Sequence, residues 1–160
     1  MAPTQQLLGL ALFVVLCFGA AAVGGFATAP EIQGWYAGIE KPSWNPPDWI
    51  FGPVWTVLYL LMAVAAWLVW RPAGFGPARI ALGLFGLQLL LNAAWSWIFF
   101  AAQRPGWAAV EIVVLWLAIA ATAVAFRHHS RAAAWLLAPY LAWVGFAACL
   151  NVAIWRLNSG

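Results

Sequence analysis

The sequence contains very few charged residues. Only 7% of its 160 residues are Asp, Glu, Lys or Arg, whereas 66% are hydrophobic. A soluble domain has about 25% charged residues, so this chain lacks the polar side chains needed to cover a surface that faces water. We therefore expect lipid to surround most of it, and the small, scattered net charge of +3 argues against a nucleic-acid partner.

Ionisable side chains are also missing from the middle of the apolar segments. Proton-coupled pumps and ion carriers usually place such groups at the membrane midplane, so the sequence argues against both classes. The nearest acid is Glu111. We expect it in the first turn of its helix, where the helix dipole favours an anion.

Metal-ligating residues are scarce. The two cysteines, Cys17 and Cys149, lie within apolar segments, where we expect them to be buried packing residues. His128 and His129 lie between arginines in a short polar break and do not share a helix face. With no histidine inside an apolar segment, haem ligation is disfavoured. We therefore expect no metal site and no required cofactor.

Long apolar segments dominate what is present. A helix needs about 20 residues to cross a bilayer, and the segments do not alternate as the strands of a membrane β-barrel do. The first segment has no Lys or Arg before its apolar run, which disfavours a cleaved signal peptide. The sequence predicts an all-α integral membrane protein, a five-helix bundle in one domain over residues 1–160. The predicted helices run from Gln5 to Ala27, Ile50 to Trp70, Ile80 to Ala102, Trp107 to Phe126 and Ala132 to Trp155.

The distribution of basic residues favours one orientation. The end of the bundle that holds the N-terminus also holds Arg71, Arg79, Arg127 and Arg131, whereas the other end holds Lys41, Arg104 and Arg156. Basic residues are enriched on the inner side of a membrane. The excess is small, and it predicts a multi-pass protein with its N-terminus inside.

The segment KPSWNPPDWIFGPVW, residues 41–55, combines proline with tryptophan. Pro42, Pro46, Pro47 and Pro53 disfavour a regular helix there, and non-helical backbone is not stable facing lipid. We therefore expect residues 28–49, here called the lid loop, to form a stiff lid over one end of the bundle. Asp48 is expected to cap the second helix.

Aromatic and amide side chains share faces of three predicted helices. Two interpretations remain open: interfacial tryptophan belts with amides that join helices, or a ligand cavity between the second, third and fifth helices. Trp95 and Trp143 lie deeper than a belt, which favours the cavity. The faces consist of Trp55, Tyr59 and Met62; of Gln88, Asn92, Trp95 and Phe99; and of Tyr140, Trp143, Ala147 and Asn151.

Three stretches resemble the translocator protein or tryptophan-rich sensory protein family. They are WYAGIEKPSWNPPDWIFGPVWTVLY from Trp35, LQLLLNAAWSWIFF from Leu87 and PYLAWVGFAACLNVAIWRLNSG from Pro139. The resemblance implies a five-helix membrane bundle, usually dimeric, that binds porphyrins, sterols and synthetic aromatic ligands in one cavity closed by the first loop.

The resemblance also implies a set of ligand-binding residues, to which the helix-face pattern adds Gln88. Three functions remain open: a receptor or transport-type protein for porphyrins, a light-dependent porphyrin-degrading enzyme, and a structural membrane protein without a ligand. Trp55 and Trp143 match tryptophans implicated in porphyrin breakdown in some bacterial relatives. The implied set is Tyr36, Pro46, Trp55, Asn92, Trp95, Trp107, Trp143, Ala147 and Leu150.

Two further features concern sterols and self-association. Animal members of the family carry a sterol-recognition stretch with a tyrosine near the end of the fifth helix, whereas this chain has Val152 and Ala153 there. The missing tyrosine argues against high-affinity sterol binding. Gly83 and Gly86 lie on one side of the third helix, where small residues let helices approach closely. They predict a homodimer interface, with packing inside one chain as the alternative.

Overall fold

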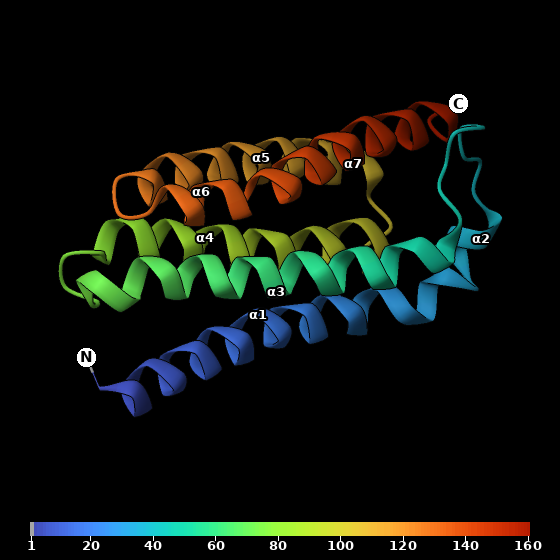
Figure 1. Cartoon of the computed structure of the whole chain (residues 1–160). Helices are drawn as coiled ribbons and strands as arrows, with labels where there is room; N and C mark the ends of the chain where they lie inside the picture. Colours follow the sequence, from blue (N-terminus) through green and yellow to red (C-terminus); the bar gives the residue numbers. More distant parts are fainter. Residues whose placement is uncertain (1) are drawn as a thin grey trace.

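The structure, a computed structural model, describes residues 2–160 and is built from helices (Figure 1). Five helical spans, 3–32, 48–73, 79–101, 105–127 and 131–157, are long and apolar enough to cross a membrane. The predicted all-α bundle of five membrane helices is confirmed. The elements are α1 (Pro3–Ile32), α2 (Trp35–Gly38), α3 (Asp48–Ala73), α4 (Arg79–Ser96), the π-helix η1 (Trp97–Ala101), α5 (Pro105–Arg127), α6 (Arg131–Leu136) and α7 (Ala138–Leu157).

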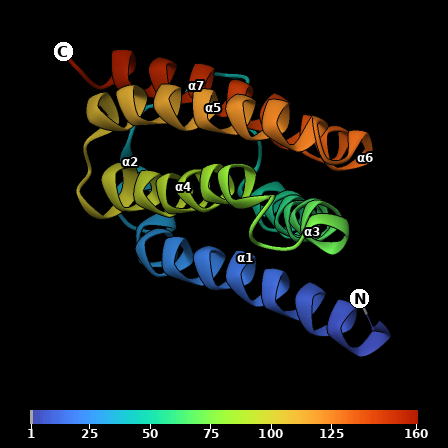
Figure 2. The ribbon, with the colours of Figure 1, turned by 90° about the vertical axis from the view of Figure 1, so that its left-hand side faces the viewer.

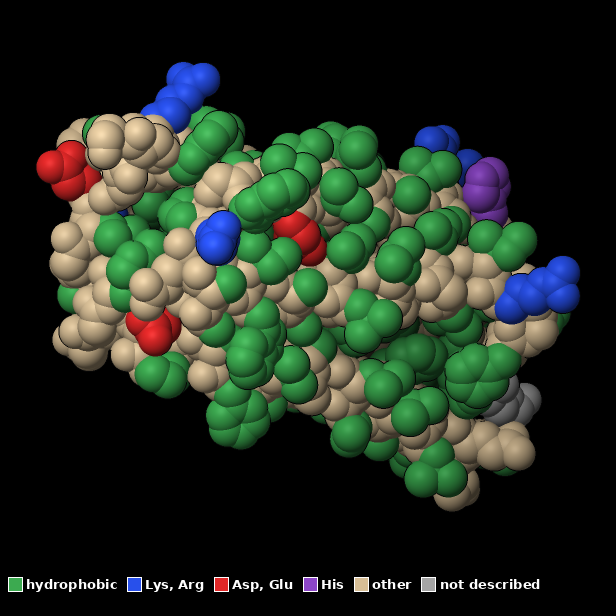
Figure 3. All heavy atoms as spheres, turned by 180° about the vertical axis from the view of Figure 1, so that it is seen from behind, with side chains coloured by type: hydrophobic (Ala, Val, Ile, Leu, Met, Phe, Trp, Pro, Cys, Tyr) green, Lys and Arg blue, Asp and Glu red, His purple; other side chains and the backbone are tan. Residues whose placement is uncertain are grey.

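The helices stack in layers. In two perpendicular views α5 and α7 lie on one side, α4 lies in the middle and α1 lies on the opposite side (Figures 1 and 2). The chain ends lie at opposite ends of the bundle. Seen from behind, hydrophobic side chains cover most of its length, while Lys and Arg lie mainly toward the two ends (Figure 3). This distribution suits a molecule whose middle is surrounded by lipid.

The lid loop is more helical than the sequence predicts. α1 continues through Pro30 to Ile32, and α2 adds one turn at Trp35–Gly38. Within the lid loop only residues 33–34 and 39–47 have no helical structure. Pro30 lacks the N–H that would bond the fourth carbonyl before it, and a helix near its end tolerates the loss of one bond.

Asp48 does not cap α3 as the sequence predicts. The N-cap is Pro47, no side chain bonds the first turn, and Asp48 is already helical. Its carboxylate still lies at the positive end of the helix dipole. The prediction that Pro53 disfavours a regular helix is wrong. α3 continues through Pro53, because neighbouring structure can compensate for one missing hydrogen bond in a membrane helix.

The last predicted helix is divided into α6 and α7. α6 ends at Leu136, Leu137 joins the two, and α7 begins at Ala138. Pro139 follows at once. Since proline has no N–H to donate to the carbonyl of Trp135, the α-helical ladder is interrupted there. The division allows α6 to contact α3 while α7 packs on α5.

Candidate functional site

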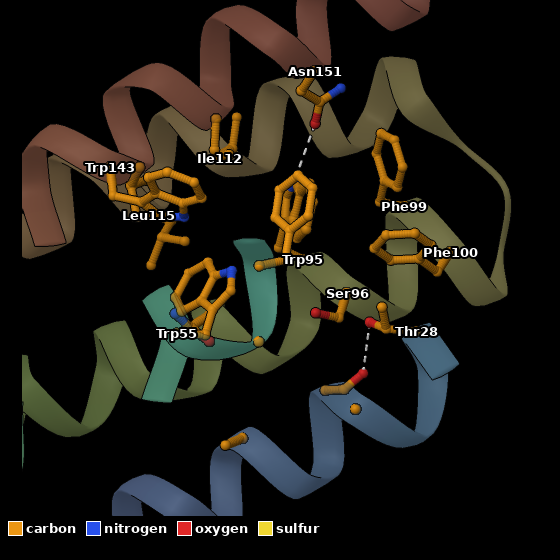
Figure 4. Close-up of a pocket in the computed structure, with 18 of the residues that line it drawn as sticks. Thr28, Trp55, Trp95, Ser96, Phe99, Phe100, Ile112, Leu115, Trp143 and Asn151 are labelled. Atoms are coloured by element: carbon orange, nitrogen blue, oxygen red, sulfur yellow. Dashed lines mark hydrogen bonds between the residues drawn. The ribbon is translucent and has the colours of Figure 1, made fainter. Parts of the chain in front are cut away.

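A cavity of about 320 Å³ lies inside the bundle beneath α2 (Figure 4). This volume is in the range of small-molecule sites, about 300–1,000 Å³. Every membrane span contributes to its wall, and among the described residues none that lines it is charged. Its aromatic lining comprises Phe18, Tyr36, Phe51, Trp55, Tyr59, Trp95, Phe99, Phe100 and Trp143.

Most of the predicted site residues meet in this wall, and some do not. Gln88 is buried behind it, Trp107 is 65% exposed on the outside of α5, and Pro46 belongs to the lid loop without reaching the cavity. Residues on a shared helix face point in the same direction, but the pattern does not show how deep in the bundle each side chain lies. The sequence therefore could not separate Gln88 from the lining residues. Those that line the cavity are Tyr36, Trp55, Asn92, Trp95, Trp143, Ala147 and Leu150.

A hydrogen-bonded chain fixes one side of the wall. The Tyr59 hydroxyl donates to Asn92 Oδ1 at 2.5 Å, and Asn92 Nδ2 donates to the Tyr140 hydroxyl at 2.7 Å. That hydroxyl in turn donates to Gln88 Oε1 at 2.8 Å. The chain joins α3, α4 and α7, and it uses both the carbonyl and the amino group of Asn92. We conclude that these bonds fix the orientation of the Asn92 side chain in the wall.

Trp95 is held by a second amide. Its Nε1 donates to Asn151 Oδ1 at 2.9 Å, and Asn151 Nδ2 donates to the Pro105 carbonyl at 2.8 Å. This arrangement connects α4 to α7 and to the start of α5. The indole plane of Trp95 is therefore fixed before any ligand arrives, which lowers the entropy lost on binding.

Trp143 differs from Trp95 because its indole N–H has no partner. Nε1 of Trp143 is buried and makes no hydrogen bond within residues 2–160. Leaving a buried donor unpaired costs about 1–3 kcal/mol. Trp55 lies across the cavity from Trp143, with Leu115 beside the two rings (Figure 4). Both indoles line the cavity, Trp55 from α3 and Trp143 from α7, and we call the space between them the slot.

The π-helix supplies aromatic lining that sequence reasoning missed in part. Phe99 stacks on Trp95 with ring centroids 5.0 Å apart, and Phe100 contacts Phe99 edge to face at 4.9 Å. A π-helix turns less per residue than an α-helix, so consecutive side chains stay closer to one face. The sequence placed Phe99 on the shared face but gave no signal for Phe100.

α1 and α5 also line the cavity, whereas the sequence predicted only the second, third and fifth helices. α1 contributes small residues, including Gly24 and Gly25, and α5 contributes Ile112 and Leu115. Their apolar composition is what any lipid-facing helix shows. Only packing reveals which of their faces turns inward.

Hydrogen bonds to α7 hold the lid loop over the cavity. Oδ1 of Asn158 accepts from the Glu40 backbone N–H at 3.0 Å, and Nδ2 of Asn158 donates to the Glu40 carbonyl at 2.9 Å. We call this pair the latch. It joins residues far apart in sequence, and pattern analysis gave no signal for it.

Lys41 strengthens the lid from within. Its Nζ donates to the carbonyls of Tyr36 and Ile39 and lies 4.6 Å from the centre of the Tyr36 ring. The Tyr36 hydroxyl donates to Asn45 Oδ1 at 3.3 Å. Burial is the main factor that raises the pKa of Tyr36 above its ordinary value of 10.0. The phenol therefore stays neutral and able to donate at physiological pH.

Glu111 lies outside the cavity wall and deeper than the sequence predicts. α5 begins at Pro105, so Glu111 belongs to the second turn rather than the first. Both carboxylate oxygens are buried and unpaired within residues 2–160. In the same part of the chain no cluster of three or more His, Cys, Asp or Glu could hold a metal ion. Cys17 is buried as expected, whereas Cys149 is exposed.

Comparisons with known proteins point to one family along most of the chain. The sequence model of the TspO/MBR family matches residues 13–156. The chain is 46% identical over 144 residues to the translocator protein of Sus scrofa, covering 86% of this chain and 85% of that protein. It is 49% identical over 128 residues to the translocator protein of Homo sapiens, with coverages of 79% and 76%. With the tryptophan-rich protein TspO of Archaeoglobus fulgidus it shares 43% identity over 148 residues, with coverages of 92% and 94%.

Proposed function

Because this chain belongs to the TspO/MBR family and has five membrane spans, we propose that it is a membrane receptor or transport-type protein for porphyrins of the protoporphyrin IX type. The observation that carries the proposal is the slot between Trp55 and Trp143, with its buried, unpaired indole N–H. A flat aromatic ring would stack in this slot, and an acceptor on that ring would pair with the free donor.

The absence of charge in the cavity wall limits how such a ligand binds. Among the described residues that line the cavity, none offers a cation to a carboxylate. The macrocycle would occupy the aromatic part, since each offset aromatic pair contributes about 0.5–1.5 kcal/mol beyond burial. Its propionates would stay at the edge of the cavity, because burying an unpaired charge is costly.

Synthetic aromatic ligands meet the same requirements, whereas sterols fit them less well. A sterol is not aromatic and gains nothing from ring stacking. On the outside of α7, Val152 and Ala153 stand where the family's sterol stretch carries aromatic residues. We therefore expect weaker binding of sterols than of porphyrins.

Fluorescence titration tests the proposal. Protoporphyrin IX added to the purified protein in nanodiscs should quench intrinsic tryptophan fluorescence with saturation at one site per chain. Trp107→Phe is the matched control, because Trp107 lies outside the cavity and its loss should leave the affinity unchanged. Quenching that rises linearly without saturation, or equal affinities for porphyrin and cholesterol, would contradict the proposal.

A second candidate is light-dependent porphyrin degradation. The observation that favours it is that Trp55 and Trp143 line the same cavity. Illumination of the porphyrin complex should then bleach the porphyrin absorption, and the double variant Trp55→Phe with Trp143→Phe should abolish this reaction while some binding remains. Bleaching at the wild-type rate in that variant would leave the receptor function alone.

Two properties of the assembly complete the proposal. The chain forms a homodimer through the outer face of α4, and its N-terminus lies on the inner side of the membrane. The second statement is supported by Arg71, Arg79, Arg127 and Arg131, which all lie in the first or last turn of a helix on the N-terminal side of the bundle.

A further inference from the structure

The exposed part of the cavity wall lies on one side. Gly25 on α1 and Gly52 and Thr56 on α3 line the cavity and are exposed on the protein surface. Every described lining residue on α4, η1, α5 and α7 is buried or half-buried. The cavity therefore reaches the outside between α1 and α3.

α1 leaves α3 along this stretch. Its first half packs tightly on the second half of α3: Trp67 Nε1 donates to the Gln6 carbonyl at 2.9 Å, and a Cβ at Gly9 would lie 2.0 Å from the Trp70 ring. Further along, α1 packs on α4 and η1 instead, since a Cβ at Gly24 would lie 3.1 Å from Ser96 Oγ. The gap opens where α1 changes partner.

Glycine keeps this gap clear. A Cβ built at Gly25 or at Gly52 would meet nothing within 4 Å. Each residue therefore contributes only backbone to its side of the gap, and a larger side chain at either position would project into open space. In Figure 4, Thr28 and Ser96 lie together on the α1 side, apart from Trp55 on α3.

We propose that this gap is a lateral window through which ligands pass between the cavity and the hydrocarbon core of the bilayer. The lateral window is bounded by Ala21 and Gly25 on α1 and by Gly52 and Thr56 on α3. The inference rests on the proposed function and extends it: the ligand class consists of flat molecules with an apolar ring system, which enter the membrane first and keep any charged group at its surface.

The chemistry of the rim matches lipid rather than water. Its bounding residues carry no charge, and the Thr56 hydroxyl is used internally, donating to the Gly52 carbonyl at 2.8 Å. The neighbouring side chains Phe26, Trp49 and Val57 are exposed and apolar. Because α1 and α3 are both membrane spans, a ligand at this window would leave one apolar medium for another.

Unlike the side between α1 and α3, the lid end of the cavity is closed. Tyr36, Phe100 and Ile154 are buried there, and the latch between Asn158 and Glu40 holds the loop down. Passage through this end would require breaking those bonds and exposing apolar rings to water. The lid therefore favours a closed cavity at this end, and exchange takes place at the side.

Plugging the window tests the inference. Gly25→Leu and Gly52→Leu should both fold, because each site has open space and leucine favours helix over glycine. In nanodiscs, stopped-flow exchange of protoporphyrin IX should be at least about tenfold slower in the double variant, in both association and dissociation. The matched control Gly19→Leu, also in open space on α1 but outside the wall, should exchange normally. Asn158→Ala, which opens the latch, should also exchange the ligand at the wild-type rate.

Ligand exchange at the wild-type rate in the Gly25→Leu, Gly52→Leu double variant would refute the lateral window. Faster ligand exchange in Asn158→Ala, together with no effect of the two leucines, would also refute it. A ligand-independent measurement separates this inference from the proposed function. With Cys17→Ser and Cys149→Ser as background, Ala147→Cys places a thiol in the cavity wall for labelling by bilayer-dissolved benzyl methanethiosulfonate. Leucine plugs that slow the labelling support the window even if porphyrin does not bind, whereas equal labelling rates refute it.

Discussion

Trp143 shows how one atom can distinguish a binding surface from a packed core. Its ring is well packed, with Phe51 edge to face at 6.0 Å and Phe146 at 5.5 Å. Its N–H is nevertheless left without an acceptor. Buried polar groups in folded proteins are almost always paired, and we propose that a bound ligand supplies the missing acceptor.

Replacing Trp143 separates the ring from the N–H. Trp143→Phe keeps an aromatic surface and removes the donor, and one lost hydrogen bond of about 0.5–1.5 kcal/mol should weaken porphyrin binding roughly two- to tenfold. Trp143→Ala removes the stacking as well and should weaken it by about tenfold or more. Titration of both variants measures the difference, and equal affinities in wild type, Trp143→Phe and Trp143→Ala would place the site elsewhere.

The buried carboxylate of Glu111 leads to a second prediction for a single residue. Its buried carboxylate oxygens have no partner within residues 2–160, and a charge there would lack compensation. Glu111→Gln keeps the shape without the charge. We expect its melting temperature in detergent to equal or exceed that of wild type at pH 7, with Glu111→Leu as a comparison. A clear loss of stability in Glu111→Gln would show that the carboxylate binds a specific partner.

At the scale of the elements, the lid loop is held on the bundle both by hydrogen bonds and by aromatic packing. The latch uses exposed groups of Asn158 and Glu40, whereas Trp35 of the lid loop packs on Phe99 with ring centroids 5.7 Å apart. Exposed hydrogen bonds open more easily than packed rings. The loop should therefore loosen without any change in the bundle.

Removing the latch tests this separation. Asn158→Ala deletes the two hydrogen bonds of the latch, which together contribute about 1–3 kcal/mol, and one further bond from Asn158 Nδ2 to the Ile154 carbonyl. Amide hydrogen exchange at Glu40 and its neighbours should become at least about tenfold faster, since a loss of 1.4 kcal/mol is a factor of ten. Exchange in α5 should not change. In Asn158→Asp, which keeps the acceptor and loses the donor, the effect should be intermediate, and uniform acceleration across the chain would indicate global destabilisation instead.

At the scale of the whole molecule, the outer face of α4 stands free. Ile80, Leu87 and Leu90 are exposed, and with Gly83 they recur every three or four residues, as on one helix face. A Cβ at Gly83 or Gly86 would meet nothing within 4 Å. Packing of these glycines within one chain, the alternative left open by the sequence, is therefore wrong.

A second copy of the chain is the partner we expect on this face. Gly83→Leu with Gly86→Leu should prevent close approach of two α4 helices and yield monomers in mild detergent. Mass measurement by light scattering distinguishes monomer from dimer, and the control Gly76→Leu, in open space outside α4, should remain dimeric. A dimer that survives both leucines would move the interface to another face.

The sequence by itself determined the solvent and the fold class. Charge is so scarce that only lipid could surround the chain, and segments of about 20 apolar residues can satisfy their backbone in lipid only as helices. It also indicated much of the site, because residues such as Asn92 and Trp95 share a helix face whenever a regular helix forms. Short motifs were enough to indicate the family.

Only the tertiary structure decided how deep each side chain lies, how the lid loop is held closed and where the cavity opens. Whether Gln88 faces the cavity or lies behind it depends on how α4 is rotated against its neighbours. For an apolar helix such as α1 the sequence carries no signal for its rotation, because lipid and protein interior are equally apolar. The latch joins Glu40 to Asn158 across most of the chain, and the lateral window depends on where α1 changes partner from α3 to α4. Contacts between residues so distant in sequence follow from packing, which local patterns do not encode.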